Sequence, residues 1–168
     1  MNKVLRAATA VVALALTSTP VAAVSPATQA TASAKIFRPL TISFVQNLDF
    51  GTLVLSGGGA WAGQVISMDQ TGVLTGCGTN VTCSGTPKPA QYKLVGTNNA
   101  IVTISSPGFN LTGPGTLAFT PNAPATVNLG TTGSTTGVTF GIGGSITLAS
   151  TTPDGVYTGT FAVTADYQ

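Results

Sequence analysis

The chain ends in Gly155-Val-Tyr-Thr-Gly-Thr-Phe-Ala-Val-Thr-Ala-Asp-Tyr-Gln168, and this stretch decides the fold. Its odd positions carry Tyr157, Gly159, Phe161, Val163, Ala165 and Tyr167, whereas the even positions from Thr158 onward are mostly polar. Alternation with a period of two over this length predicts a β-strand with one buried face. In a complete immunoglobulin-like sandwich, one more strand follows the strand predicted here and covers it. The sequence contains no residues after Gln168 to form that strand. We therefore expect an all-β, immunoglobulin-like sandwich that is incomplete.

The sequence before this ending also predicts strands. Thr, Val, Ile, Phe and Tyr dominate, Glu is absent, and clusters of Gly, Pro, Asn and Ser interrupt the chain about every ten residues. The predicted strands are Leu40–Val45, Gly51–Leu55, Gln64–Met68, Gly72–Thr75, Gln91–Gly96, Ile101–Ser105, Thr116–Thr120, Thr126–Leu129, Gly137–Ile142, Ser145–Ala149 and Val156–Tyr167. We interpret the Gly-rich pieces 56–59 and 141–144 as turns, because neither has the Lys-Ser/Thr of a phosphate-binding loop.

Composition excludes several classes of function. The chain has 168 residues, of which 6% are charged, and it contains no His and no Glu. The commonest general base and metal ligand is thus missing, and two cysteines cannot build a zinc site of four soft ligands. The basic residues form no patch, which argues against nucleic acid as a partner. We expect no enzyme, no catalytic residue, no metal and no cofactor.

The first 23 residues have the layout of a secretory signal peptide. Lys3 and Arg6 precede an apolar stretch, and Val21 and Ala23 are small residues at the −3 and −1 positions of a cleavage site. The apolar run is too short to span a bilayer comfortably, and we expect no integral membrane segment after cleavage. Secretion implies an oxidising compartment, in which Cys77 and Cys83 predict a disulfide. A loop this small stabilises by about 2 kcal/mol.

Residues 24–37 form a second alternating segment, with mostly small side chains. Val24, Ala30, Ala32, Ala34 and Ile36 fall on its apolar side, and Pro39 separates it from the next predicted strand. The segment is compatible with a disordered tail, with an ordinary first strand of the same domain, or with a strand given to a neighbouring molecule.

Several stretches resemble a known group of proteins. Gly155, the fourteenth residue from the end, and the penultimate Tyr167 resemble the C-terminal signature of chaperone–usher pilus subunits. The ending from Asp154 to Tyr167 is similar to the last strand of archaic fimbrial and spore-coat-U-like subunits. Residues 34–42, 48–53 and 89–96 resemble a family of secreted bacterial β-sandwich domains of unknown function. The small cysteine loop and the Ala-rich N-terminal segment depart from the better-known pilus subunits.

The resemblance implies donor-strand complementation, in which one chain adds a strand to the open edge of another. Residues 24–37 would be the donor strand, through Val24, Ala30, Ala32, Ala34 and Ile36, and residues 38–168 the sandwich domain. The acceptor groove, which a chaperone also binds, would involve Gly155, Tyr157, Phe161, Val163, Ala165 and Tyr167. The implied partners are a periplasmic chaperone, an outer-membrane usher and further copies of the chain in a head-to-tail filament. The implied location is an extracellular fibre at the cell surface, reached through the periplasm.

A second function remains open at this point. The chain would also suit a self-contained secreted module that binds carbohydrate or adheres to a surface. Trp61, which lies beside small residues, is the one Trp available to stack on a sugar, although a lone aromatic in a sandwich usually serves packing.

Overall fold

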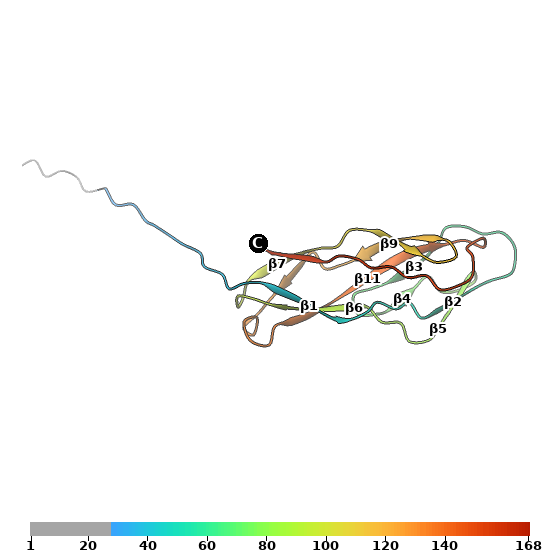
Figure 1. The fold of residues 1–168 in the computed structure, drawn as a ribbon, viewed down its shortest axis with the longest axis horizontal. Helices are drawn as coiled ribbons and strands as arrows, with labels where there is room; N and C mark the ends of the chain where they lie inside the picture. Colours follow the sequence, from blue (N-terminus) through green and yellow to red (C-terminus); the bar gives the residue numbers. More distant parts are fainter. Residues whose placement is uncertain (1–27) are drawn as a thin grey trace, which may run out of the picture. The chain divides into compact units, whose positions relative to one another are not determined.

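The computed structural model describes residues 28–168, and its regular elements are all β-strands (Figure 1). The compact unit comprises Lys35–Gln168, whereas residues 28–34 fall into a separate unit and form no strand. None of the described residues lies in a helix that could cross a membrane. The predicted signal peptide, residues 1–23, lies outside the described residues.

The strands of the compact unit form a sandwich-like fold of antiparallel sheets. The strands are β1 (Thr41–Gln46), β2 (Thr52–Leu55), β3 (Gln64–Met68), β4 (Leu74–Thr75), β5 (Val81–Ser84), β6 (Ala90–Val95), β7 (Ile101–Ser105), β8 (Phe109–Thr112), β9 (Thr116–Asn122), β10 (Thr126–Asn128), β11 (Val138–Leu148) and β12 (Thr164–Tyr167). The larger sheet has the order β1-β6-β11-β3-β4, with β9 also paired to β11 and β8 to β9. A second sheet has the order β10-β7-β12, and β2 pairs with β5.

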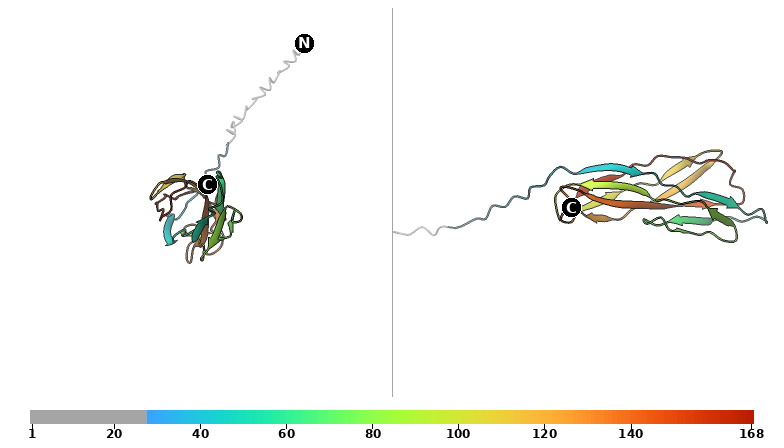
Figure 2. Two further views of the ribbon diagram at one scale, coloured as in Figure 1. Left: turned by 90° about the vertical axis from the view of Figure 1, so that its right-hand side faces the viewer. Right: turned by 90° about the horizontal axis from the view of Figure 1, so that it is seen from below.

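Alternating side chains fill the interior between the sheets. In β7, Val102 and Ile104 are buried while Ile101, Thr103 and Ser105 are exposed, which is the pattern of a strand with one face on a core. The larger sheet contributes Leu94 and Ile142 to the same cluster of buried side chains. A second cluster contains Ile66, Leu117 and Phe119. The two views of Figure 2 show the strands running lengthwise and curling around this interior. The predicted all-β sandwich is thus confirmed.

Strand β11 corrects the prediction of a turn at residues 141–144. The chain does not turn there, because one strand covers both stretches that we predicted as separate strands. Residues 138–142 pair with β6, whereas residues 144–148 pair with β3 and residues 143–146 with β9. Glycines occupy the part of β11 where its partner changes from β6 to β3, because a Cβ atom would strike the Gln70 carbonyl at Gly141, the Met68 carbonyl at Gly143 and the Phe119 ring at Gly144.

Other boundaries also differ from the sequence prediction. Strands β5 and β8 were missed, and the predicted last strand Val156–Tyr167 is hydrogen-bonded as a strand only over Thr164–Tyr167. Earlier in that stretch the backbone makes a single bridge, between Thr112 and Thr158. The β12–β7 register, extended by two residues, would pair Ala162 with Pro107, which has no backbone N–H to donate, so the ladder ends at Thr164.

The disulfide that the sequence predicts is present in the structure. Cys77 and Cys83 form a disulfide, with their Cα atoms 5.7 Å apart. Within this loop Gly78 donates its backbone N–H to the Val81 carbonyl at 2.8 Å. The pair closes the loop that leads into β5, as predicted.

Candidate functional site: the seam between β1 and β12

Two edge strands border one side of the compact unit. β1 is hydrogen-bonded only to β6 and β12 only to β7 among the strands described. Both pack against the same core cluster, β1 through Ile42 and the C-terminal stretch through Phe161, Val163 and Ala165. We call this place the β1/β12 seam; Figure 1 shows both of its borders on the near side. It leaves core-facing side chains only half-buried, because no described strand covers them.

Side chains along the C-terminal stretch alternate as the sequence predicted. Those of Tyr157, Phe161, Val163, Ala165 and Tyr167 are half-buried, whereas the even positions from Thr158 to Gln168 are exposed. The alternation therefore extends beyond the four residues of β12. At Gly159, which would continue the inward row, a Cβ atom would lie 2.6 Å from the Phe109 ring. Tyr157 packs against the second core cluster rather than the first, and its hydroxyl donates to the Pro153 carbonyl at 2.7 Å.

The backbone of β12 has an unpaired outer edge. Gln168 donates its N–H to the Ile101 carbonyl at 3.1 Å, and the register pairs Asp166 with Thr103. Hydrogen-bonded and non-hydrogen-bonded residue pairs alternate along an antiparallel ladder. Because Gln168 is hydrogen-bonded to β7, Asp166 also directs its backbone N–H and C=O toward β7, whereas Ala165 directs its N–H and C=O away from β7. The N–H and C=O of Ala165 are thus available to a further strand, as at other sheet edges.

Aromatic rings line the floor of the seam. Phe161 stacks on Phe109 with centroids 5.5 Å apart and meets Tyr92 edge-on at 6.4 Å. Tyr92 in turn meets Phe44 of β1 at 6.0 Å, and Phe44 remains 59% exposed. Burial raises the pKa of the Tyr92 phenol. These rings connect the two borders of the seam and give it an apolar floor.

One end of the seam is closed by the penultimate residue. The Tyr167 ring stacks on Phe37, with centroids 4.4 Å apart and planes inclined by 13°. Its hydroxyl accepts the Thr97 backbone N–H at 2.7 Å and donates to the Arg38 carbonyl at 2.8 Å. The Arg38 N–H donates to the Thr97 Oγ1 at 2.7 Å. We call these contacts the Tyr167 clamp; they join the C-terminal strand to the residues that precede β1.

Sequence reasoning identified Tyr167 but missed its partners. Phe37 lies at the end of the predicted donor segment, yet it packs against the core of its own domain. Gly96 belongs to the clamp as well, because a Cβ atom there would strike the Tyr167 hydroxyl. Gly155 has a φ of +143°, and a Cβ atom there would strike Pro114. The sequence feature that could have indicated the clamp is the run Phe37-Arg38-Pro39, which ends the alternating segment.

The predicted donor residues carry exposed side chains where the structure describes them. Ala30, Ala32 and Ala34 are exposed and lie outside any strand, and Ile36 is 87% exposed. Val24 lies outside the described residues.

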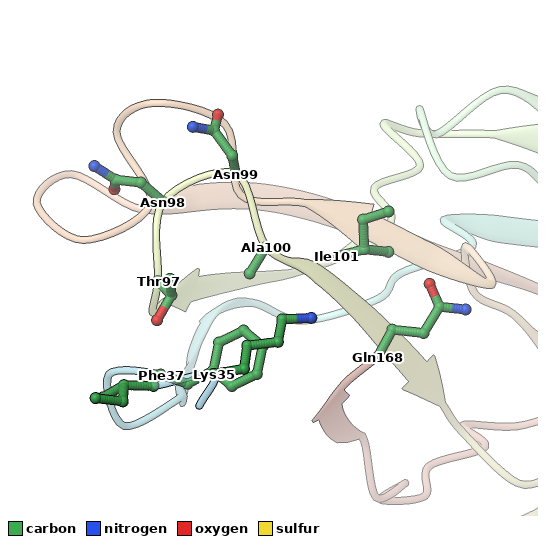
Figure 3. Close-up of a pocket in the computed structure, with 9 residues that line it drawn as sticks. Lys35, Phe37, Thr97, Asn98, Asn99, Ala100, Ile101 and Gln168 are labelled. Atoms are coloured by element: carbon green, nitrogen blue, oxygen red, sulfur yellow. The ribbon is translucent and has the colours of Figure 1, made fainter. Parts of the chain in front are cut away.

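A shallow pocket of about 430 Å³ lies beside the clamp (Figure 3). Lys35, Thr97, Asn98, Asn99 and Gln168 contribute its polar side chains. The Asn98 Oδ1 already accepts the Ser134 backbone N–H at 2.7 Å. Within residues 28–168 no group of three or more His, Cys, Asp or Glu side chains gathers as metal ligands would. Trp61, the sugar-stacking candidate, is half-buried against the second core cluster.

The family DUF4402, described as a domain of unknown function, matches residues 40–167. The chain belongs to the DUF4402 family. The match runs from the residue before β1 to the last residue of β12, so the DUF4402 domain includes both borders of the seam. No curated protein and no solved structure gives a significant match.

Proposed function

We propose that this chain is a structural subunit of a bacterial surface fibre, assembled by donor-strand exchange. In this proposal a periplasmic chaperone first occupies the seam, and an outer-membrane usher then guides its replacement by the N-terminal segment of another copy. The observation that carries the proposal is the seam itself, where an unpaired strand edge borders a core whose side chains are only half-covered. Strand addition at such an edge provides backbone hydrogen bonds and side-chain pockets together.

The N-terminal segment has the properties that such an edge requires. Its apolar side presents Ala30, Ala32, Ala34 and Ile36, and these side chains are exposed in the chain. Burial of a few hundred Å² would contribute several kcal/mol at about 25 cal/mol per Å². A contact from one copy to the next that does not close on itself generates a filament. Small donor side chains also suit a seam whose floor is filled by the rings of Phe161 and Tyr92.

The test uses a charge placed on either side of the donor segment. Ala32→Asp puts a carboxylate on the apolar side, whereas the matched control Ser33→Asp puts it on the polar side of the same segment. We expect ladders of denaturant-resistant oligomers on unboiled gels from the wild-type chain and from Ser33→Asp, and only monomer from Ala32→Asp. Ladders of equal intensity from all three chains would contradict donation through this segment.

A second variant tests the acceptor side of the same contact. Phe161→Asp places a charge among Phe109, Tyr92 and Phe119, which buries it without a counter-ion. We expect this chain to be lost from the periplasm, since neither the chaperone nor a donor strand can bind the seam. Normal assembly of Phe161→Asp would show that the seam is not the acceptor. The alternative, a self-contained adhesive module, predicts a soluble wild-type monomer that forms no ladder at any concentration.

A further inference from the structure

We propose that the Tyr167 clamp prevents the N-terminal segment from folding back into the seam of its own domain, so that the segment stays available to another copy. This inference rests on the proposed function and concerns the choice between a donor strand in cis and one in trans. It is carried by the contacts of Tyr167, Phe37, Arg38 and Thr97.

The clamp ties both borders of the seam together at one end. Tyr167 belongs to β12, and Arg38 lies three residues before Thr41, the first residue of β1. Arg38 is held at both backbone groups, because its N–H donates to Thr97 Oγ1 and its carbonyl accepts the Tyr167 hydroxyl. Lys35, the first residue of the compact unit, and Phe37 lie beside Thr97 at this closed end (Figure 3).

The residues next to the clamp are extended rather than turned. The Lys35 Nζ lies 4.7 Å from the centroid of the Phe37 ring, while Ile36 between them is 87% exposed on the other side. Side chains of residues i and i+2 share a face only in extended backbone. A segment that enters its own seam must reverse direction, and a tight reversal takes four residues. Residues 35–38 are the place for that turn, and the clamp holds them straight.

A turn placed earlier in the segment would not serve. A turn at residues 35–38 removes Ile36 as a donor side chain, but a turn at residues 31–34 would remove Ala32 and Ala34 as well. Gly96 indicates that the clamp is built into the domain, because any side chain there would displace the Tyr167 hydroxyl. Opening the clamp is therefore the condition for insertion in cis.

The experiment combines the clamp with the donor segment in the full chain. Tyr167→Phe keeps the stacked ring and removes both hydrogen bonds of the hydroxyl; Ala32→Asp blocks the segment as a donor. Monomers of the wild type, both single variants and the double variant are isolated at low concentration, and their thermal midpoints are measured. We expect Ala32→Asp to change the thermal midpoint of the wild-type monomer by less than about 1 °C, because its segment lies outside its own seam. In the Tyr167→Phe monomer, whose segment can enter the seam, we expect Ala32→Asp to lower the midpoint by about 5 °C. Ser33→Asp in the Tyr167→Phe background is the control and should change nothing.

The outcomes separate the clamp from the proposed function. If the clamp has a purely structural role, Tyr167→Phe lowers the thermal midpoint by the same amount in the wild-type and in the Ala32→Asp chain. That result would overturn the inference. Gly96→Ala, which expels the hydroxyl by another route, should reproduce the sensitivity to Ala32→Asp if Tyr167→Phe folds poorly. Ladders from the wild type combined with an insensitive Tyr167→Phe monomer would contradict the clamp alone, whereas the absence of wild-type ladders would contradict the fibre.

Discussion

Three glycines in the middle of β11 are required by what passes beside them. At Gly141 the nearest neighbour is the Gln70 carbonyl, at Gly143 the Met68 carbonyl and at Gly144 the Phe119 ring. Backbone carbonyls cannot move aside as the end of a flexible side chain can, so a methyl group at Gly141 forces the strands apart. The sequence alone suggests turns for such a run, because the close approach involves residues far away along the chain.

Gly141→Ala tests this explanation at the level of one residue. We expect a loss of about 2–3 kcal/mol in the free energy of unfolding, measured by chemical denaturation, since overpacking against backbone has no easy relief. Gly57→Ala is the matched control, because no atom lies within 4 Å of the added methyl group. Its effect should stay within about 0.5 kcal/mol. Equal stability of the two variants would show that β11 tolerates side chains where its partner changes.

The turn between β3 and β4 depends on one carboxylate. The Asp69 Oδ1 accepts the Thr71 hydroxyl at 2.7 Å, the Thr71 N–H at 2.8 Å and the Val73 N–H at 2.9 Å. The Thr71 hydroxyl, followed by the Val73 N–H, lowers the pKa of Asp69 below its ordinary value of 3.8. A lowered folded-state pKa stabilises the protein above the unfolded-state pKa, and this contribution is lost as the pH falls through the folded-state value.

Replacement of Asp69 should therefore change the pH dependence of stability. We expect Asp69→Asn to lower the thermal midpoint at pH 7 and to have a progressively smaller effect as the pH falls below 3.8 through the folded-state pKa of Asp69, because the wild-type carboxyl then loses its charge. Thr71→Ala should raise the pKa of Asp69, as followed by NMR titration of its carboxyl carbon, because it removes the strongest donor. An Asp69 pKa that stays the same in Thr71→Ala would show that the hydroxyl has no part in the shift.

Short runs rich in Val and Ile were predictable from the sequence where turn residues bound them. β3 and β7 have the predicted bounds because each is such a run between clear turn signals. β5 and β8 were missed, because Val81–Ser84 begins inside the cysteine loop and Phe109–Thr112 directly follows Pro107 and Gly108. The Tyr167 clamp was also beyond prediction: Tyr167 and Arg38 lie 129 residues apart in the chain.

At the scale of the whole molecule, the seam should accept the segment as a separate peptide. A synthetic peptide of residues 24–36 added to the Ala32→Asp chain should raise its thermal midpoint progressively with peptide concentration, because binding to the folded state alone stabilises it. The same peptide with Ala32→Asp is the control and should have no effect. A midpoint independent of peptide concentration up to millimolar levels would contradict an open edge at β12.

The Tyr167 clamp also determines how tension would pass through the compact unit. A pull on the residues before Lys35 reaches Phe37 and Arg38 first, and from there it divides between β1 and, through the Tyr167 hydroxyl, the last strand. The pulling force is then divided between two hydrogen-bonded ladders, β1 on β6 and β12 on β7, which bear it at the same time rather than one after the other. A single phenolic oxygen thus couples the mechanical strength of two sheets.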